Sequence, residues 1–597
     1  MSTASPGQKK IINNMSANNM VIAAPGSGKS FTMIEGVAEI LNRFPYARIG
    51  MVTFTRAAAD SLSEKLKKKL TEEKLDRIKI NTFHGFVKMQ LDEMKWNGRL
   101  LIGSALRSMI HRAINHAGIS MDLSAAEFAI DAIGRETDHD VVAIKFSSLQ
   151  INLFNTYQKL CQKDGVADFN ALSKYVTSQL NSGMIRPLNL THLIVDEVQD
   201  TDSIQFSWIS QHTRRGIHTS IVGDDDQAIY SFRSSGGVKI FQMFEKNFTP
   251  NVFYLNTCFR CEPEILSFAD TLIQHNNYRY MKELQSGKEG GGKVTFFCYR
   301  SMEEQLQGIV ELIDQDPYGW AILSRGNAHL DKVENILSQE TIRYGGKSFW
   351  DEKESSDVLH LMAFFRHPYD KRLMKRVLAL FGEDEQVLDE VASRMAGKKV
   401  TFDMLPLPEE SSVAVKSIHK NFSRFITDTR DKTEIAKRIQ NLIKWMENAF
   451  IKMVSAKGGQ SITRVAIDTC QQWAERDGWD KMINRAAGLC LGTKKNNKEY
   501  TPDKVVLSTL HGSKGLEWKK VIILSCTSEQ IPNPKCVGTE LIEEERRLLY
   551  VGCTRAEKEL YVLWYGAPSY FLNECAPEMV IEAESALTRP KQIEKND

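Results

Sequence analysis

The sequence has almost no net charge and no long apolar run. Its 77 Lys and Arg residues are balanced by 75 Asp and Glu residues, which leaves a formal net charge of +2. Overall basicity therefore indicates no nucleic-acid partner, and any contact with DNA or RNA would need a local groove. No run approaches the roughly 20 apolar residues that span a bilayer, and residues 1–10 lack the apolar centre of a signal peptide. We expect a cytoplasmic protein with no membrane partner.

Paired cysteine motifs are also scarce. The ten cysteines are scattered along the chain, and only Cys258 and Cys261 have C-x-x-C spacing. A structural zinc site takes four ligands, usually from two such pairs. We therefore interpret these two residues as reduced thiols beside a strand, with zinc binding as the less favoured alternative.

The length and the residue pattern predict several globular domains. A chain of 597 residues corresponds to about three to five domains of roughly 100–200 residues. Strand-like and helical segments alternate in two parts of the chain, which predicts an α/β fold with two parallel-sheet domains, each with a mainly helical insertion. A polar run at residues 494–498 is predicted to be a hinge or linker. The predicted domains are 1–86 plus 187–252 with insertion 87–186, and 253–362 plus 503–597 with insertion 363–502.

A loop of small residues follows the apolar run Met20-Val21-Ile22. Its sequence, A-A-P-G-S-G-K-S at residues 23–30, predicts a phosphate loop at the start of a helix, although Ala23 stands where the strict pattern has glycine. Lys29 would reach the β- and γ-phosphates, and Ser30 would bind Mg²⁺. An ordinary strand-turn-helix is the alternative. The predicted nucleotide contacts in the loop are Ala24, Pro25, Gly26, Ser27, Gly28, Lys29 and Ser30.

Two later strands end in polar side chains that suit phosphate chemistry. An apolar run at residues 193–195 leads into Asp196 and Glu197. Asp196 would hold Mg²⁺, and Glu197 would orient and deprotonate the attacking water. A strand that merely ends in a solvated acidic turn is the alternative, and the upstream phosphate loop disfavours it. The next strand would place Gln227 near the γ-phosphate.

Aromatic residues follow this second strand. Tyr230 and Phe232 stand beside Arg233. Bases stack on aromatic rings while a cation meets the phosphate backbone, so the cluster predicts a groove for a single strand. Packing of the rings in a core explains the spacing equally well.

Together, these stretches resemble the motifs of superfamily 1A helicases, the UvrD/Rep/PcrA-like family. Residues 196–201 and 222–230 resemble motifs II and III. The resemblance spans residues 8 to about 560 and implies two RecA-like P-loop domains with parallel sheets flanked by helices. Residues 52–58, 82–86, 255–260, 508–518 and 543–556 resemble motif Ia, the short motif after it, and motifs IV, V and VI.

The resemblance implies an ATP site that uses Mg²⁺. Arg260 and Arg555 would contact the γ-phosphate, although a surface salt bridge with a neighbouring glutamate is an alternative for Arg555. Phe259 would stack on adenine, Gln8 would read its edge and Glu517 would contact the ribose. The implied catalytic residues are Lys29, Glu197, Gln227, Arg260 and Arg555.

The resemblance also implies contacts with DNA. Four positions depart from the family pattern: Arg56-Ala57 replaces Asn-Lys, Phe232 stands where Trp is frequent, and Ser234 replaces Gly. We expect these changes to affect base stacking more than ATP hydrolysis. The implied DNA contacts are Phe54, His84, Tyr230, Phe232, Arg233 and His511.

The resemblance implies an ATP-dependent DNA helicase or translocase. It would move 3′→5′ on single-stranded DNA and act at single-strand/duplex junctions in DNA repair, replication or recombination. The alternative is a DNA-stimulated ATPase that serves, with a protein partner, as a switch or remodelling subunit of a repair, replication or anti-phage complex. A small-molecule kinase explains neither the second α/β domain nor motifs V and VI.

Overall fold

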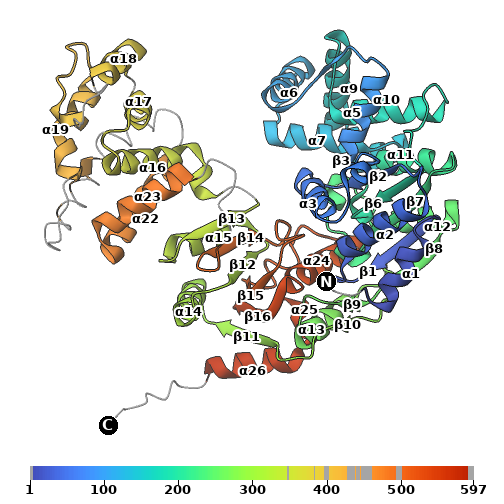
Figure 1. Ribbon diagram of the computed structural model, residues 1–597. Helices are drawn as coiled ribbons and strands as arrows, with labels where there is room; N and C mark the ends of the chain where they lie inside the picture. The colour runs from blue at the N-terminus through green and yellow to red at the C-terminus, as the bar shows by residue number, and fades with distance from the viewer. Residues whose placement is uncertain are drawn as a thin grey trace. The chain divides into compact units, whose positions relative to one another are not determined.

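The computed structural model describes residues 4–345, 348–381, 383–394, 402–426, 437, 441, 444–445, 460–492 and 501–588. The chain divides into two compact units, one formed by Met1–Arg300 with Lys514–Asp597 and the other by Ser301–Ser513 (Figure 1). No helix in the described ranges is long and apolar enough to cross a membrane. The hinge predicted at residues 494–498 lies outside these ranges.

A six-stranded parallel sheet organises the first unit, with strand order β3-β2-β6-β7-β1-β8. Most of its central strand residues are buried and apolar, because helices cover both faces of such a sheet. The strands are β1 (Asn19–Ala23), β2 (Ile49–Thr53), β3 (Ile78–Thr82), β6 (His192–Val195), β7 (His218–Gly223) and β8 (Asn251–Leu255).

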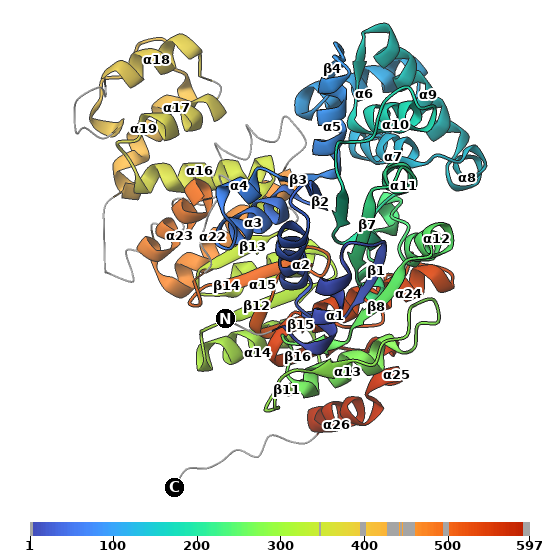
Figure 2. The same ribbon diagram turned by 45° about the vertical axis from the view of Figure 1, so that its right-hand side comes forward.

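Two apolar cores lie on opposite faces of this sheet. On one face pack α1 (Pro6–Asn14), α2 (Lys29–Arg43) and α3 (Arg56–Lys67), with the short α4 (Glu72–Leu75) following α3. On the other face pack α5 (Phe83–Glu93), α10 (Phe169–Asn181), α11 (Ser203–Arg214) and α12 (Val238–Phe248). Figure 2 shows this sandwich from the side. The helices leave the carboxyl ends of the strands available for loops.

The segment between α5 and α10 is mainly helical and has an apolar core of its own. Its helices pack on one another rather than on the sheet, whereas α10 belongs to the core of the sheet. The elements are β4 (Arg99–Leu100), α6 (Gly103–Ala117), α7 (Leu123–Arg135), α8 (His139–Lys145), α9 (Ser148–Lys163) and β5 (Val166–Ala167).

The first unit also contains three parallel strands in the order β11-β16-β15. They are β11 (Lys293–Tyr299), β16 (Ala556–Tyr565) and β15 (Trp518–Leu524). A short pair, β9 (Thr257–Cys258) and β10 (Gln285–Ser286), lies near the end of β8. The helices of this part are α13 (Pro263–Ile273), α24 (Thr539–Cys553), α25 (Tyr570–Cys575) and α26 (Pro577–Thr588).

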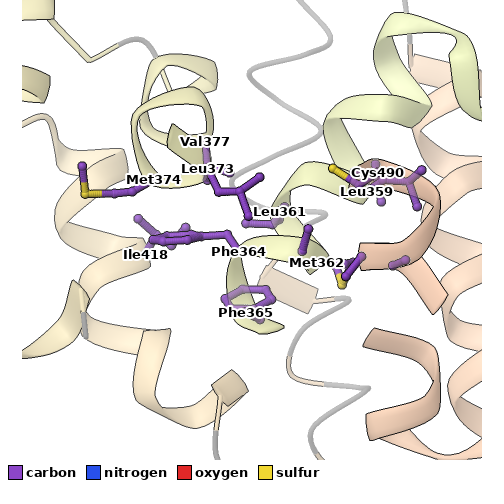
Figure 3. Close-up of a cluster of buried hydrophobic side chains, with 14 of the residues drawn as sticks. Leu359, Leu361, Met362, Phe364, Phe365, Leu373, Met374, Val377, Ile418 and Cys490 are labelled. Atoms are coloured by element: carbon purple, nitrogen blue, oxygen red, sulfur yellow. The ribbon is translucent and has the colours of Figure 1, made fainter. Parts of the chain in front are cut away.

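The second unit combines three parallel strands with a helical bundle. Its strand order is β12-β14-β13, from Trp320–Ser324, Val505–Thr509 and Thr341–Tyr344. The large bundle core contains Phe364, Met374 and Ile418 (Figure 3). The helices are α14 (Met302–Gln315), α15 (Asn327–Ile336), α16 (Lys353–Arg366), α17 (Lys371–Leu380), α18 (Glu385–Arg394), α19 (Val413–Ile426), α22 (Gln460–Asp477) and α23 (Trp479–Gly492). Parallel strands flanked by helices confirm the predicted α/β fold class.

Candidate functional site

The predicted phosphate loop joins β1 to the start of α2. Gly26 and Gly28 have φ angles of 62° and 78°, which glycine adopts without the cost that a side chain adds. Space also requires glycine, because a Cβ at Gly26 would lie 2.5 Å from the Cβ of Arg260. Gly28 is the N-cap of α2 and supplies no side-chain cap, so the free N–H groups of the first turn suit an anion.

The hydroxyl of Ser27 is buried in this loop without a hydrogen-bond partner in the structure. A buried hydroxyl that lacks a partner costs free energy, and such groups in native proteins usually meet a ligand or water. A phosphate oxygen held by the loop would satisfy it. The loop residues therefore fit the nucleotide that the sequence predicts.

Lys29 and Glu197 form the charged centre of the site. Lys29 Nζ lies 3.0 Å from Glu197 Oε1, and the backbone N–H of Glu197 donates to Asp196 Oδ1 at 3.0 Å. Burial and the adjacent charge of Glu197 raise the pKa of Asp196 to about 7. Burial also opposes ionisation of Glu197, but Lys29 and Lys514 outweigh it and lower that pKa to about 2. Glu197 is therefore the member of the pair that keeps its negative charge.

Glu197 also has an uncommon backbone conformation, with φ 50° and ψ 44°. This left-handed conformation costs free energy for any residue other than glycine, and residues that adopt it cluster at functional sites. The turn directs the Glu197 carboxylate to Lys29, at the start of α2. Asp196 and Glu197 therefore differ in pKa, and Glu197 is the carboxylate that pairs with Lys29.

Gln199 was not singled out by sequence reasoning, yet it joins the ends of two strands. Its Nε2 donates to the Glu197 carboxylate, and its Oε1 accepts the backbone N–H of Asp224 at 3.1 Å. Gly223 allows this approach, because a Cβ there would lie 2.3 Å from Gln199 Oε1. The amide therefore links the loop after β6 to the loop after β7.

Arg555 and Gln227 meet although 328 positions separate them in the chain. Arg555 Nη2 donates to Gln227 Oε1 at 3.1 Å, and its remaining donors go to backbone carbonyls and the Thr554 hydroxyl. The guanidinium is 1% exposed and has no carboxylate partner among the described residues. Burial and the nearby charge of Arg260 lower its pKa to about 9. The structure therefore does not support the surface salt bridge considered as an alternative for Arg555.

Arg260 lies against the phosphate loop and is paired. Its Nε donates to Glu517 Oε2 at 2.6 Å, and one Nη donates to the Thr554 carbonyl at 3.3 Å. The family resemblance implies Glu517 at the ribose and Arg260 at the phosphate, and the structure brings the two side chains together. Arg260 therefore lies against the loop that suits an anion, and the buried Arg555 contacts Gln227.

The residues expected at the nucleotide base lie beside the same loop. Gln8 is buried, and its Nε2 donates to the Ser27 carbonyl at 3.1 Å while its Oε1 accepts the backbone N–H of Ser5. The backbone N–H of Phe259 donates to the Gly26 carbonyl at 2.9 Å, and the ring is 45% exposed. Phe259 thus offers a ring face next to the phosphate loop.

A buried cluster of three aspartates precedes Gln227 and holds its side chain. The carboxylates of Asp224, Asp225 and Asp226 lie close enough together to bind a metal ion, but Lys282 Nζ lies 2.6–2.7 Å from all three. Arg279 adds two hydrogen bonds to Asp226, and Gln227 Nε2 donates to Asp224 at 2.6 Å. Because Lys282 and Arg279 already pair with these carboxylates, we interpret the cluster as the structural support of Gln227.

Replacing Lys282 by methionine should lower the free energy of unfolding by about 3–5 kcal/mol, since breaking a buried ion pair leaves carboxylates without compensation. The side chains of Lys282 and of the three aspartates are 0% exposed. Urea titration of the K282M and K246M variants measures this loss, with exposed Lys246 as the matched control. Equal midpoints for the two variants would show that the cluster adds no stability.

The predicted strand-contact residues gather beside the acidic loop. The rings of Phe54 and Tyr230 stack at 5.8 Å with 10° between their planes, and Phe232 meets Tyr230 edge-on at 5.9 Å. Arg233 lies 5.6 Å from the centres of both the Tyr230 and Phe232 rings. Phe54 and Phe232 are 39% and 44% exposed, so they are not core residues. The core-packing alternative considered for Tyr230 and Phe232 is therefore wrong for the Phe232 ring.

The two histidines predicted to contact DNA lie in different units. His84 lies in the first turn of α5 and stacks on Phe169 at 4.7 Å, and burial with Arg135 nearby lowers the pKa of His84 to about 4. Phe169 was not predicted, because a single aromatic residue at the start of a helix has no local signature. His511 follows β14 in the second unit.

Lys514 is a further residue that sequence reasoning missed. Its Nζ lies 2.7 Å from both carboxylate oxygens of Asp200 and 2.8 Å from the Gln227 carbonyl. The same ammonium lies 5.0 Å from the centre of the Tyr230 ring. One cation therefore contacts both the loop of Gln227 and the aromatic cluster.

A parallel sheet with a phosphate loop after β1 defines the class of P-loop proteins. A family model described as the UvrD/REP helicase N-terminal domain matches residues 4–249. A second, described as the UvrD-like helicase C-terminal domain, matches residues 253–404 and 411–567. The chain therefore belongs to the UvrD/REP helicase family.

Named relatives match along nearly the whole chain. "ATP-dependent DNA helicase Rep" of Buchnera aphidicola subsp. Schizaphis graminum is 26% identical over 656 residues, which cover 96% of each chain. "DNA helicase II" of Escherichia coli strain K12 is 26% identical, covering 98% of this chain and 89% of the relative. "ATP-dependent DNA helicase PcrA" of Bacillus subtilis strain 168 is 25% identical, covering 94% and 82%.

Proposed function

We propose that this protein is an ATP-driven motor that moves 3′→5′ along single-stranded DNA and unwinds duplex at junctions. The observation that carries the proposal is the buried Arg555 guanidinium, which lacks a carboxylate and is hydrogen-bonded to Gln227. A buried cation without an anion is costly, so this position favours an anionic ligand such as a γ-phosphate. Relatives named as ATP-dependent DNA helicases support the same activity, and the polarity is inferred from the motif resemblance.

In the proposed mechanism the chain surrounds the triphosphate with preplaced groups. Lys29 exchanges Glu197 for the β- and γ-phosphates, while Arg260 and Arg555 stabilise charge on the transferring phosphoryl group. Glu197, freed from Lys29, accepts a proton from the attacking water. Gln227 is held by Asp224 and Arg555 and orients that water. Mg²⁺, when held by Ser30 and Asp196, would neutralise negative charge on the phosphates.

Contacts of Lys514 connect the nucleotide site to the aromatic residues predicted to bind single-stranded DNA. Lys514 contacts the backbone of Gln227 and the ring of Tyr230. A shift of Gln227 as the γ-phosphate is bound or lost would therefore move a cation that lies over the aromatic cluster. Coupling between the ATP site and the aromatic cluster needs two arrangements of the packed groups that join them. The ATP-bound and ATP-free states would supply these two arrangements. We infer that this alternation changes the grip of Phe54, Tyr230 and Phe232 on DNA.

Replacing Phe232 by alanine should mainly weaken this grip. Stacking of one base on an aromatic ring contributes about 1–3 kcal/mol, so the DNA concentration for half-maximal ATPase stimulation should rise about 5- to 150-fold. Titrating single-stranded DNA into an ATPase assay measures the change. The variant F128A is the matched control, because Phe128 is 50% exposed and lies on α7. An unchanged half-maximal concentration for F232A would remove Phe232 from the strand site.

A paired assay separates the motor from the alternative of a DNA-stimulated switch subunit. ATP hydrolysis is measured with and without single-stranded DNA, and unwinding is measured on 3′-tailed and 5′-tailed duplexes. We expect stimulated hydrolysis, unwinding of the 3′-tailed duplex, and loss of both in K29A. Stimulated hydrolysis without unwinding of either substrate would contradict the helicase and favour the switch.

A further inference from the structure

The two cysteines of the C-x-x-C motif lie next to the phosphate loop, and Cys258 packs against it at Gly26. The backbone N–H of Cys261 donates to Cys258 Sγ at 3.4 Å, and Cys261 Sγ donates to the Thr554 carbonyl at 3.5 Å. A Cβ added at Gly26 would lie 3.3 Å from Cys258 Sγ. Both thiols are free and 0% exposed. The dithiol is thus packed between the phosphate loop and the residue that precedes Arg555.

A metal does not explain this pair. A zinc site takes four ligands, and two further donors would be needed beside the thiols. Among the described residues, no group of three or more His, Cys, Asp and Glu ligands includes Cys258 or Cys261. The thiols are, however, adjacent and chemically unequal. The thiol of Cys261, against the opposing effect of burial, lowers the pKa of Cys258 to about 6, whereas the pKa of Cys261 is raised.

We propose that Cys258 and Cys261 form a peroxide-sensitive dithiol whose oxidation to a disulfide disables the ATP site. The Cys258 thiol loses its proton and the thiolate attacks one peroxide oxygen, so that the O–O bond breaks and Cys258 becomes a sulfenic acid. The hydroxide that leaves takes up the released proton and becomes water. Cys261 sulfur then attacks the Cys258 sulfur, the S–O bond breaks and water leaves with the Cys261 proton. Two thiols and hydrogen peroxide thus give one disulfide and two waters.

The location explains why this modification would affect ATP hydrolysis. Phe259 and Arg260 lie inside the ring that the disulfide closes, and both contact Gly26 or its surroundings. A sulfur–sulfur bond of about 2.05 Å would draw Cys258 and Cys261 from their present contacts. Arg260 would then shift relative to the phosphates. A misplacement of about 1 Å near a reacting group can cost on the order of 10²-fold in rate.

Peptide mapping tests the bond itself, independently of the proposed function on which its effect rests. Trypsin cleaves after Arg260, so Cys258 falls in peptide 247–260 and Cys261 in peptide 261–279, each with one cysteine. After treatment with hydrogen peroxide, we expect these two peptides joined, and separated again by dithiothreitol. Because both sulfurs are buried, the bulky oxidant glutathione disulfide should link the two cysteines more slowly than hydrogen peroxide does. Peroxide treatment that leaves the two peptides unlinked would overturn the proposal.

The ATPase assay tests the consequence. Peroxide should lower hydrolysis on the order of 10²-fold, dithiothreitol should restore it, and the C258S/C261S variant should show the same rate before and after treatment. The control variant C536S/C575S removes two partly exposed thiols and should remain sensitive. If the linked peptides form without any change in rate, the proposed switch is wrong. If the reduced protein hydrolyses no ATP, the proposed function fails instead, and the linked peptides still establish the dithiol.

Discussion

Replacing Arg555 by lysine is expected to lower kcat for ATP hydrolysis by about 10³-fold, the lower end of what arginine fingers supply. Lysine keeps the charge but loses the planar set of donors. In the structure those donors hold Gln227 Oε1, the Leu516 and Val551 carbonyls and the Thr554 hydroxyl. The ammonium could not keep Gln227 placed and also reach a phosphate. Single-turnover ATP hydrolysis with DNA present measures the loss.

The matched control is R546K, because Arg546, on α24, is also a buried arginine. Its donors go to Asn276 and Glu574, away from the phosphate loop. Lysine at this position should change folding stability more than the rate of hydrolysis. Equal losses of rate in R555K and R546K would show that a general effect of buried arginines, and not contact with the phosphate, explains Arg555.

Replacing Glu197 by glutamine is expected to lower ATP hydrolysis by about 10²–10⁴-fold, the range that a positioned general base contributes. Glutamine keeps the size of the side chain and its hydrogen bond to Gln199 but cannot accept a proton from water. Lys29 and Lys514 keep Glu197 ionised, with a pKa lowered to about 2. When Lys29 moves to the phosphates, Lys514 still lowers the pKa of Glu197, so the base stays ionised at neutral pH and the loss should not depend on pH.

Nucleotide binding separates catalysis from misfolding in this variant. Lys29 loses its ionic partner in E197Q, so the binding of ATP should stay as tight as in the parent or become tighter. Fluorescence titration with a labelled nucleotide measures it, and K29A is the comparison that should lose binding. Near-normal hydrolysis in E197Q would show that another group activates the water.

The phosphate loop, the two acidic strand ends and the fold class could be predicted because each depends on local pattern. Parallel sheets bring the carboxyl ends of strands to one edge, so Lys29, Glu197 and Gln227 were expected together. Family resemblance added Arg260 and Arg555, whose positions no local pattern shows. The structure places Arg555 against Gln227, a contact between residues 328 positions apart.

The residues that were missed make long-range contacts with no signature of their own. Lys282 lies 56–58 positions beyond the aspartates that it neutralises, and an isolated lysine predicts nothing about burial. Gln199 and Lys514 stand within recognised motifs, but their roles depend on which loops meet in space. Three adjacent aspartates after a buried strand were the one available signal, since such a cluster needs a cation.

The central claim is that ATP hydrolysis at this site moves the protein along one DNA strand in one direction. Displacement of streptavidin from biotin at either end of a single-stranded oligonucleotide tests that claim most directly. We predict ATP-dependent displacement from the 5′ end, slow release from the 3′ end, and neither in E197Q. Displacement from the 3′ end would reverse the proposed direction. Active hydrolysis with no displacement from either end would contradict the motor.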